Sequence, residues 1–207
     1  MHTSTTDLKL TSSPQLSFAG MAKGGEAGFR TEMLKRSLLT LLFTDIVEST
    51  QMIERLGDEA WYTLLVRHDA MVRARLAAFG GREVRCTGDG FFAIFDEPAR
   101  GIHCAAEVRS ALKALGMRIR CGLHTSECLM AGRQVSGLAV HIAARIAAAA
   151  RPNEILVSRA VKELTAGGEI EFADGHLHAL RGLSDEHELF TVMQAPPHGL
   201  PIRQKSV

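Results

Sequence analysis

The sequence predicts an α+β domain on a ferredoxin-like split βαβ plan, in the order β-α-β-β-α-β with an α-β extension. Three observations lead to this expectation. An apolar run at residues 38–43 precedes a long segment whose apolar residues follow helical spacing. Two short β-rich runs then flank Gly88-Asp89-Gly90, which is typical of a hairpin. A second helical segment and an alternating strand complete the unit, so we expect a mostly antiparallel sheet with helices on one face.

Length and composition fit one folded domain with polar ends. The chain has 207 residues and a formal net charge of +1 at pH 7, so we expect no broad attraction to nucleic acid or membranes. No apolar run approaches the roughly 20 residues that cross a bilayer, and no secretory signal pattern is present. The four cysteines lack CxxC spacing, which indicates reduced thiols in a cytoplasmic protein. We expect a disordered leader over residues 1–33, the folded domain over 34–194 and a flexible tail over 195–207.

The first half of the domain is expected to supply β-α-β-β. In chain order we expect a strand, two helical segments and two hairpin strands, over residues 37–43, 47–56, 59–79, 83–86 and 91–95. Trp61 and His68 lie on the second helical segment. We expect Trp61 in the core and His68 on the surface.

The second half begins where Pro98 opens a helix, because proline is favoured in a first helical turn. We expect a helix at 99–115, a strand at 117–123, a turn into a short strand at 124–128 and a loop at 132–136. A helix at 137–150, a strand at 154–157, a short helix at 158–165 and a closing hairpin within 170–192 should follow. The helix at 137–150 is alanine-rich and apolar over most of its surface, so it is buried or packs closely against a partner.

Asp45 stands where the first apolar run ends, and Asp89 stands at the hairpin tip. Aspartate is a common helix N-cap, so one interpretation is that Asp45 only caps the next helix and never meets Asp89. In the split βαβ plan, however, the end of the first strand and the hairpin tip lie side by side. Two carboxylates that meet without a Lys or Arg partner repel each other unless a cation separates them. The pair therefore predicts a site for two Mg²⁺ or Mn²⁺ ions, completed by phosphate oxygens and water.

Three motifs in this order resemble the class III nucleotidyl cyclase catalytic domain, most closely its soluble bacterial, mycobacterial-type members. They are Phe43-Thr44-Asp45-Ile46-Val47-x-Ser49-Thr50, Thr87-Gly88-Asp89-Gly90-Phe91 and Ala139-Val140-His141-Ile142-Ala143-Ala144-Arg145. The likeness covers about residues 34–192. It implies that the 3′-hydroxyl of a nucleoside triphosphate attacks its own α-phosphate to give a 3′,5′-cyclic nucleotide and pyrophosphate. The expected function is an adenylate cyclase that makes cyclic AMP from ATP in cyclic-nucleotide signalling.

The resemblance also implies a role for each site residue. Asp45 and Asp89, together with Ile46, would hold the two metal ions. Arg145 would stabilise the charge that grows on the α-phosphoryl group, and His141 would position the ribose. Substrate contacts are implied for most of the first motif and for three further positions, namely Phe43, Thr44, Ile46, Val47, Glu48, Ser49, Thr50, Arg85, Gln134 and Arg181. Arg181 would touch the β- and γ-phosphates, with plain surface charge as its alternative.

Members of this family build each site from two protomers, so the resemblance implies a homodimer. Asp45 and Asp89 would come from one chain and Arg145 from the other. The alanine-rich helix that carries Arg145 fits such a close interface, and a monomer would be inactive.

Four positions depart from the family pattern. Arg85 replaces the usual lysine that donates to the purine, and Gln134 replaces the aspartate that accepts from the adenine amino group. His141 replaces the asparagine that positions the ribose, and Glu48 replaces a glycine beside the phosphates. Arg85 and Gln134 can still bind adenine, but the glutamine amide can also donate to guanine, which relaxes specificity. Glu48 either adds negative charge near the triphosphate or points to solvent.

Two other functions compete with the cyclase. One is a catalytically weak or inactive pseudo-cyclase that serves as a nucleotide-binding or dimerisation module, which the four departures favour. The other is an unrelated metal-dependent phosphotransferase on the same plan. Asp45, Asp89 and Arg145 in their motifs favour the cyclase over both.

Overall fold

The computed structural model describes residues 34–196. The expected leader at 1–33 and nearly all of the expected tail at 195–207 lie outside this range. Among the described helices, none is both long enough and apolar enough to cross a membrane.

The described residues form nine strands and five helices in an α+β arrangement. In chain order they are β1 (Lys35–Ile46), α1 (Ser49–Leu56), α2 (Asp58–Ala78), β2 (Arg82–Cys86), β3 (Gly90–Phe95), α3 (Pro98–Ala114), β4 (Ile119–Ala131), β5 (Gln134–Ser136), α4 (Leu138–Ala149), β6 (Ile155–Ser158), α5 (Arg159–Leu164), β7 (Glu171–Phe172), β8 (His176–Ala179) and β9 (Glu186–Gln194). The helices begin and end close to the expected bounds.

The sheet follows the split βαβ plan. Its order is β2-β3-β1-β4-β6-β9-β7, with β5 paired to β4 and β8 paired to β9. Strand β1 lies between β3 and β4 and runs antiparallel to both, whereas β4 and β6 are parallel. Strands β8 and β9 form the expected closing hairpin. The predicted fold class is therefore confirmed.

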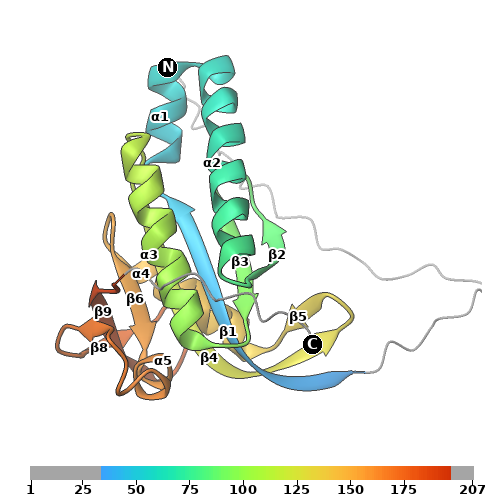
Figure 1. Ribbon diagram of the computed structural model, residues 1–207, viewed down its shortest axis with the longest axis vertical. Coiled ribbons are helices and arrows are strands. Elements are labelled where there is room, and N and C mark those ends of the chain that lie inside the picture. The colour runs from blue at the N-terminus through green and yellow to red at the C-terminus, as the bar shows by residue number, and fades with distance from the viewer. Residues whose placement is uncertain (1–33, 197–207) are drawn as a thin grey trace, which may run out of the picture. The chain divides into compact units, whose positions relative to one another are not determined.

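Helices cover both faces of the sheet, which corrects the expectation of helices on one face. Helices α2 and α3 lie in front of the sheet in Figure 1 and enclose the main core. Its buried residues from these helices and from β1 and β4 include Leu42, Ile46, Val72, Leu76, Ile102, Val108, Leu112, Ile119 and Leu123. Helix α4 packs on the opposite face, where Ala139 and Ala143 join Leu39 and Leu41 in a second cluster.

A glycine in β4 explains how closely α4 approaches the sheet. A Cβ atom added at Gly122 would lie 2.1 Å from the backbone nitrogen of Ala147, so no side chain fits there. The small residues on α4 supply the other half of this contact. Gly122 and these small residues let α4 pack closely on the face opposite α2 and α3. Helix α4 carries His141 and Arg145.

Two local expectations are wrong. Residues 124–128 do not turn but continue β4, and part of the expected loop at 132–136 is strand β5. His68 is not on the surface: it is 1% exposed, its ring lies 5.6 Å from that of Phe91, and its Nδ1 is 3.0 Å from Asp69 Oδ1. Burial lowers the pKa of His68, which favours the neutral ring. Trp61 lies in the core as expected.

Candidate active site

The end of β1 meets the β2–β3 turn, so Asp45 and Asp89 are brought to the same edge of the sheet. Asp45 is the register partner of Gly90, and the backbone nitrogen of Ile46 donates to the carbonyl of Asp89 at 2.9 Å. A Cβ atom at Gly90 would lie 2.4 Å from the carbonyl oxygen of Thr44. Glycine at this position therefore lets the turn press against β1 and carry Asp89 to Asp45.

Each carboxylate already has a hydrogen-bond donor. Ser49 Oγ donates to Asp89 Oδ2 at 2.8 Å, and Arg120 Nε donates to Asp45 Oδ2 at 2.7 Å. The expectation that these carboxylates lack an Arg partner is therefore wrong. Arg120 is the register partner of Asp45 on β4, and its guanidinium supplies the positive charge that a metal ion would bring.

The donor set fits a metal site that depends on substrate oxygens. Within residues 34–196, no group of three or more His, Cys, Asp or Glu side chains could hold a metal ion. Asp45 and Asp89 use Oδ2 for their hydrogen bonds, and neither Oδ1 atom accepts one from the described residues. Mg²⁺ is commonly held by one or two carboxylates together with substrate phosphates. The pair of aspartates matches that requirement, provided that Asp45 exchanges Arg120 for the metal.

The interpretation of Asp45 as a helix cap is wrong. Asp45 lies within β1, and the N-cap of α1 is Glu48, which makes no side-chain capping hydrogen bond. Glu48 has φ 59° and ψ 36°, a left-handed conformation that favours glycine. Its carboxylate lies 2.5 Å from the guanidinium of Arg118 on the segment leading into β4. Glu48 therefore pairs with a cation instead of pointing freely into solvent.

Other residues of the first motif hold the site together. Thr44 is buried, and its Oγ1 accepts a hydrogen bond from the backbone nitrogen of Phe91 at 3.2 Å. The ring of Phe43 stacks on that of Phe92 at 4.4 Å. Ile46 lies in the core, the nitrogen of Val47 donates to the carbonyl of Arg118, and Thr50 is exposed.

A pocket of about 480 Å³ gathers four of the predicted site residues, namely Phe43, Arg85, Gln134 and His141. Arg85 comes from β2, Gln134 from β5 and His141 from α4, so residues far apart in the sequence converge here. The lining residues are Phe43, Val84, Arg85, Thr87, Phe92, Arg133, Gln134, Val135, Val140, His141 and Ala144. Two arginines, two aromatic rings and the absence of any carboxylate in this lining suit a planar, anionic ligand.

The two remaining predicted residues lie on exposed positions. Arg145 is on α4, four residues after His141, so both side chains share one helix face. Arg181 lies in the turn between β8 and β9. Arg118, Arg120 and Arg133 are the site residues that the sequence analysis missed. Arg118 and Arg120 alternate with core residues just before β4 and at its start. Their partners, Glu48 just after β1 and Asp45 on β1, depend on the register between the two strands.

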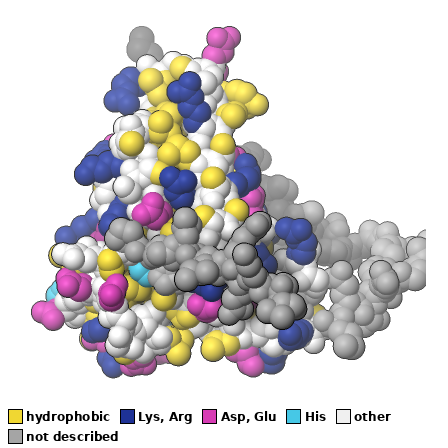
Figure 2. Space-filling view, viewed as in Figure 1, with side chains coloured by type: hydrophobic (Ala, Val, Ile, Leu, Met, Phe, Trp, Pro, Cys, Tyr) yellow, Lys and Arg dark blue, Asp and Glu magenta, His cyan; other side chains and the backbone are white. Residues whose placement is uncertain are grey.

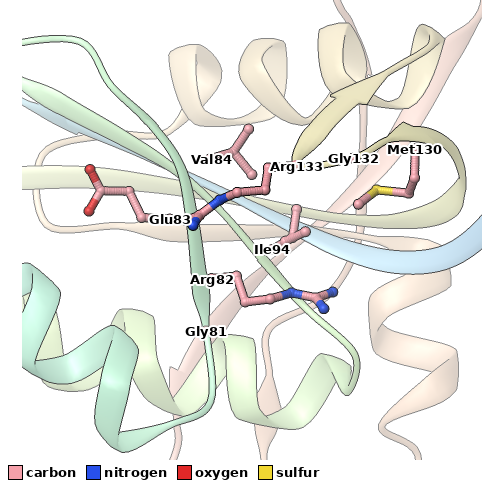
Figure 3. A pocket seen from close by; sticks show the side chains of 8 residues that line it. All are labelled: Gly81, Arg82, Glu83, Val84, Ile94, Met130, Gly132 and Arg133. Atoms are coloured by element: carbon pink, nitrogen blue, oxygen red, sulfur yellow. The ribbon is translucent and has the colours of Figure 1, made fainter. Parts of the chain in front are cut away.

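A second hollow of about 520 Å³ adjoins this pocket, because both are lined by Val84 and Arg133. Figure 3 shows Arg82 and Arg133, from β2 and from the turn after β4, at the same hollow beside the apolar side chains of Ile94 and Met130. This part of the sheet face is therefore open, with a charged rim and an apolar floor.

A split βαβ sheet with one aspartate at the end of its first strand, a second in the adjoining β2–β3 turn and a pocket beside the helix on its other face is the arrangement expected of a class III nucleotidyl cyclase. The chain belongs to this family, since residues 32–194 match the family model described as the adenylate and guanylate cyclase catalytic domain.

Solved structures and curated relatives agree with this assignment. The fold superposes on the adenylyl cyclase CyaB from P. aeruginosa with a TM-score of 0.74 at 22% identity, covering 78% of this chain and 96% of that chain. For the guanylyl cyclase Cya2 the TM-score is 0.69 at 21% identity, covering 76% and 92%. A Rhizobium meliloti protein named "Putative adenylate cyclase 3" is 25% identical over 170 residues, which cover 77% of this chain and 29% of that protein. The match thus spans less than a third of this relative's length.

Proposed function

We propose that this chain is a nucleotidyl cyclase that converts ATP to 3′,5′-cyclic AMP and pyrophosphate in cyclic-nucleotide signalling in the cytoplasm. The observation that carries the proposal is the pocket in which Arg85, Gln134 and His141 converge from three separate elements. Residues 34–194 form the catalytic domain in this account. Family membership supports cyclase chemistry, whereas the preference for ATP rests on the pocket alone.

The pocket binds the nucleoside half of the substrate. The stacked rings of Phe43 and Phe92 give it an apolar floor for the purine. Arg85 donates to N1 of adenine, and the side-chain carbonyl of Gln134 accepts from the 6-amino group. His141 positions the ribose, so that the 3′-hydroxyl points toward the α-phosphate.

The carboxylate edge acts on the triphosphate half. Asp45 and Asp89, with the backbone of Ile46, would hold Mg²⁺ or Mn²⁺. Two such ions would favour ionisation of the 3′-hydroxyl and stabilise the charge on the leaving group. The backbone nitrogens at the start of α1 face the phosphates, with Ser49 and Thr50 beside them.

The reaction is an in-line displacement at the α-phosphorus. The bond from the 3′-oxygen to phosphorus forms, the bond to the bridging oxygen of pyrophosphate breaks, and the hydroxyl proton leaves to water. Arg145 stabilises the charge on the α-phosphoryl oxygens, and Arg181 binds the β- and γ-phosphates.

We further propose that each site is shared between two copies of the chain. The pocket lining contains no carboxylate, so the metal-binding aspartates of a complete site come from elsewhere. Helix α4 also exposes Leu138, by 64%, at its start, and it carries Arg145. A homodimer would join the pocket and Arg145 of one chain to the aspartates of its partner.

One observation favours the alternative of a weak or inactive pseudo-cyclase. Arg120 engages Asp45 directly, so a metal ion must compete with an ion pair that the chain already contains. A nucleotide-binding dimerisation module would keep that pair closed.

Incubation of the purified protein with Mn²⁺ and either ATP or GTP distinguishes the two functions. The cyclase account expects cyclic nucleotide and pyrophosphate in equal amounts by mass spectrometry, with ATP consumed faster than GTP. Nucleotide binding without any cyclic product would instead support the pseudo-cyclase.

A further inference from the structure

Glu48 is a carboxylate placed directly before the helix that faces the phosphates in the proposed site. It is the N-cap of α1, and the first turn of that helix contains no acidic residue. The carbonyl of Glu48 accepts a hydrogen bond from the nitrogen of Met52, so its backbone is part of the helix start. A negative side chain here would repel a triphosphate at the same helix start.

Backbone contacts on either side fix where Glu48 lies. The nitrogen of Val47 donates to the carbonyl of Arg118 at 2.8 Å, and Ser49 Oγ donates to Asp89 at 2.8 Å. Because both neighbours are held, Glu48 keeps φ 59°, and only its side-chain torsions decide where the carboxylate points.

Arg118 sets that direction. Its Nη2 lies 2.5 Å from Glu48 Oε2, and both side chains are about half exposed, at 48% and 54%. The two residues line a hollow of about 230 Å³ together with Val47, Gln51, Met52, Arg55 and Gly116. Neither Asp45 nor Asp89 lines this hollow. The carboxylate of Glu48 is thus directed toward Arg118, and the positive charge of that guanidinium balances its negative charge.

We propose that Arg118 is a positioning residue that holds the carboxylate of Glu48 away from the triphosphate and so makes Glu48 compatible with substrate binding. This inference rests on the proposed cyclase site. Arg118 acts through Glu48 and touches no substrate atom. An exposed ion pair contributes little to stability, so the value of this pair lies in where it holds the charge.

A double-mutant cycle tests the proposal. The parent, Arg118→Met, Glu48→Gly and the double variant are compared for kcat and KM with Mn²⁺–ATP. Methionine keeps most of the apolar stem of Arg118 while removing its charge. Binding of Mn²⁺–3′-deoxy-ATP, which lacks the attacking hydroxyl, is measured by calorimetry in parallel. Arg36→Met is the matched control, because Arg36 also pairs with an exposed glutamate, Glu127, at 2.9 Å.

The expected results follow from Coulomb repulsion by the released carboxylate. Arg118→Met should raise KM and weaken 3′-deoxy-ATP binding by about tenfold, with a smaller change in kcat. Glu48→Gly should lower KM, and in its background the same Arg118→Met change should cost less than about twofold. Arg36→Met should leave both quantities as in the parent.

Two results would overturn the proposal. If the Arg118→Met defect persists in the Glu48→Gly background, then Arg118 acts on the substrate or on the fold itself. If Arg118→Met changes neither KM nor binding, then Glu48 needs no partner. A parent that binds 3′-deoxy-ATP but makes no cyclic product would refute the proposed function, while the binding cycle would still decide the role of Arg118.

Discussion

At the scale of single residues, the two aspartates differ in what they must give up before they can bind a metal. Asp89 accepts a hydrogen bond from a neutral hydroxyl, that of Ser49, whereas Asp45 is paired with the permanent charge of Arg120. A metal ion at Asp45 would therefore compete with a cation, whereas a metal ion at Asp89 would not. We expect metal affinity to depend more on the surroundings of Asp45 than on those of Asp89.

Removing either aspartate should abolish turnover without unfolding the chain. Asp45→Ala or Asp89→Ala should lower kcat at least about a hundredfold, because each removes a metal ligand at a partly exposed edge. Product formation and circular dichroism measured together check both halves of this expectation. Asp96→Ala, which removes an exposed partner of Arg82, is the control. Full activity in either site variant would refute the two-metal account.

The base preference should respond to the two pocket residues that depart from the family pattern. Arg85 and Gln134 line the same pocket, so a paired change acts on one ligand. Arg85→Lys with Gln134→Asp should raise the ATP-over-GTP ratio of kcat/KM, since an aspartate can accept from adenine but cannot donate to guanine. Kinetics with both nucleotides measure this ratio. An unchanged ratio would mean that these side chains do not read the base.

The sequence predicts which residues reach the site better than it predicts their partners. Arg85, Gln134 and His141, which the resemblance assigns to one substrate, line one pocket. The pairing of Arg120 with Asp45 could not be predicted, because it depends on the register between β1 and β4. His68 was placed wrongly for a similar reason: its burial depends on Phe91, which the fold brings against α2.

At the scale of elements, β4 shows how a run of polar residues can make a strand hard to predict from sequence. The segment after Leu123 contains His124, Thr125 and Ser126, which suggested a turn. In the structure, Thr125 Oγ1 hydrogen-bonds Thr40 Oγ1 on β1 at 2.8 Å, and His124 Nδ1 lies 2.9 Å from Ser158 Oγ on β6. The side chains of His124 and Thr125 thus find partners on neighbouring strands, and the strand continues.

The close packing of α4 on β4 should not tolerate a side chain at Gly122. Gly122→Ala places a methyl group against the backbone of Ala147, so either α4 shifts or the sheet distorts. We expect a loss of about 3 kcal/mol in the free energy of unfolding, because the added methyl group overpacks this contact. Activity should also fall, because His141 and Arg145 lie on α4. Gly168→Ala is the control, since its nearest atom would be Thr165 O at 3.3 Å. Urea titration measures the free energy of unfolding of both variants. Parent-like stability of Gly122→Ala would contradict the close packing.

Acid should weaken the link between β4 and β6. Burial, and secondarily His187, lowers the pKa of His124 to about 4 from its ordinary 6.5. The unfolded chain therefore takes up a proton below about pH 6.5 while the folded chain does not, so stability falls as the pH drops from about 6.5 toward about 4. His124→Gln should lose about 1–3 kcal/mol less than the parent between about pH 7.5 and about pH 4.5 in urea titrations. Equal losses would show that His124 does not titrate this way.

At the scale of the whole molecule, each chain of the proposed dimer would carry two half-sites. The aspartates at the end of β1 and the pocket beside α4 use different residues, and hydrophobic side chains also remain exposed elsewhere. Figure 2 shows several over α1 and α2, where Leu56, Tyr62 and Val66 are exposed. The fold could be predicted from periodicity and motif order, whereas the assembly depends on surfaces that a single sequence does not specify.

Mixing two inactive variants tests the shared cyclase site most directly. In the proposed site, Asp45→Ala removes a metal ligand and Arg145→Ala removes the charge that would stabilise the transition state, so each protein alone should make no cyclic nucleotide. In a mixture of equal amounts, half of the dimers combine both chains, and each mixed dimer keeps one intact site of two. Cyclic AMP formation should therefore recover to about one quarter of the parent rate. No recovery from chains shown to exchange would contradict the account of a site built from two protomers.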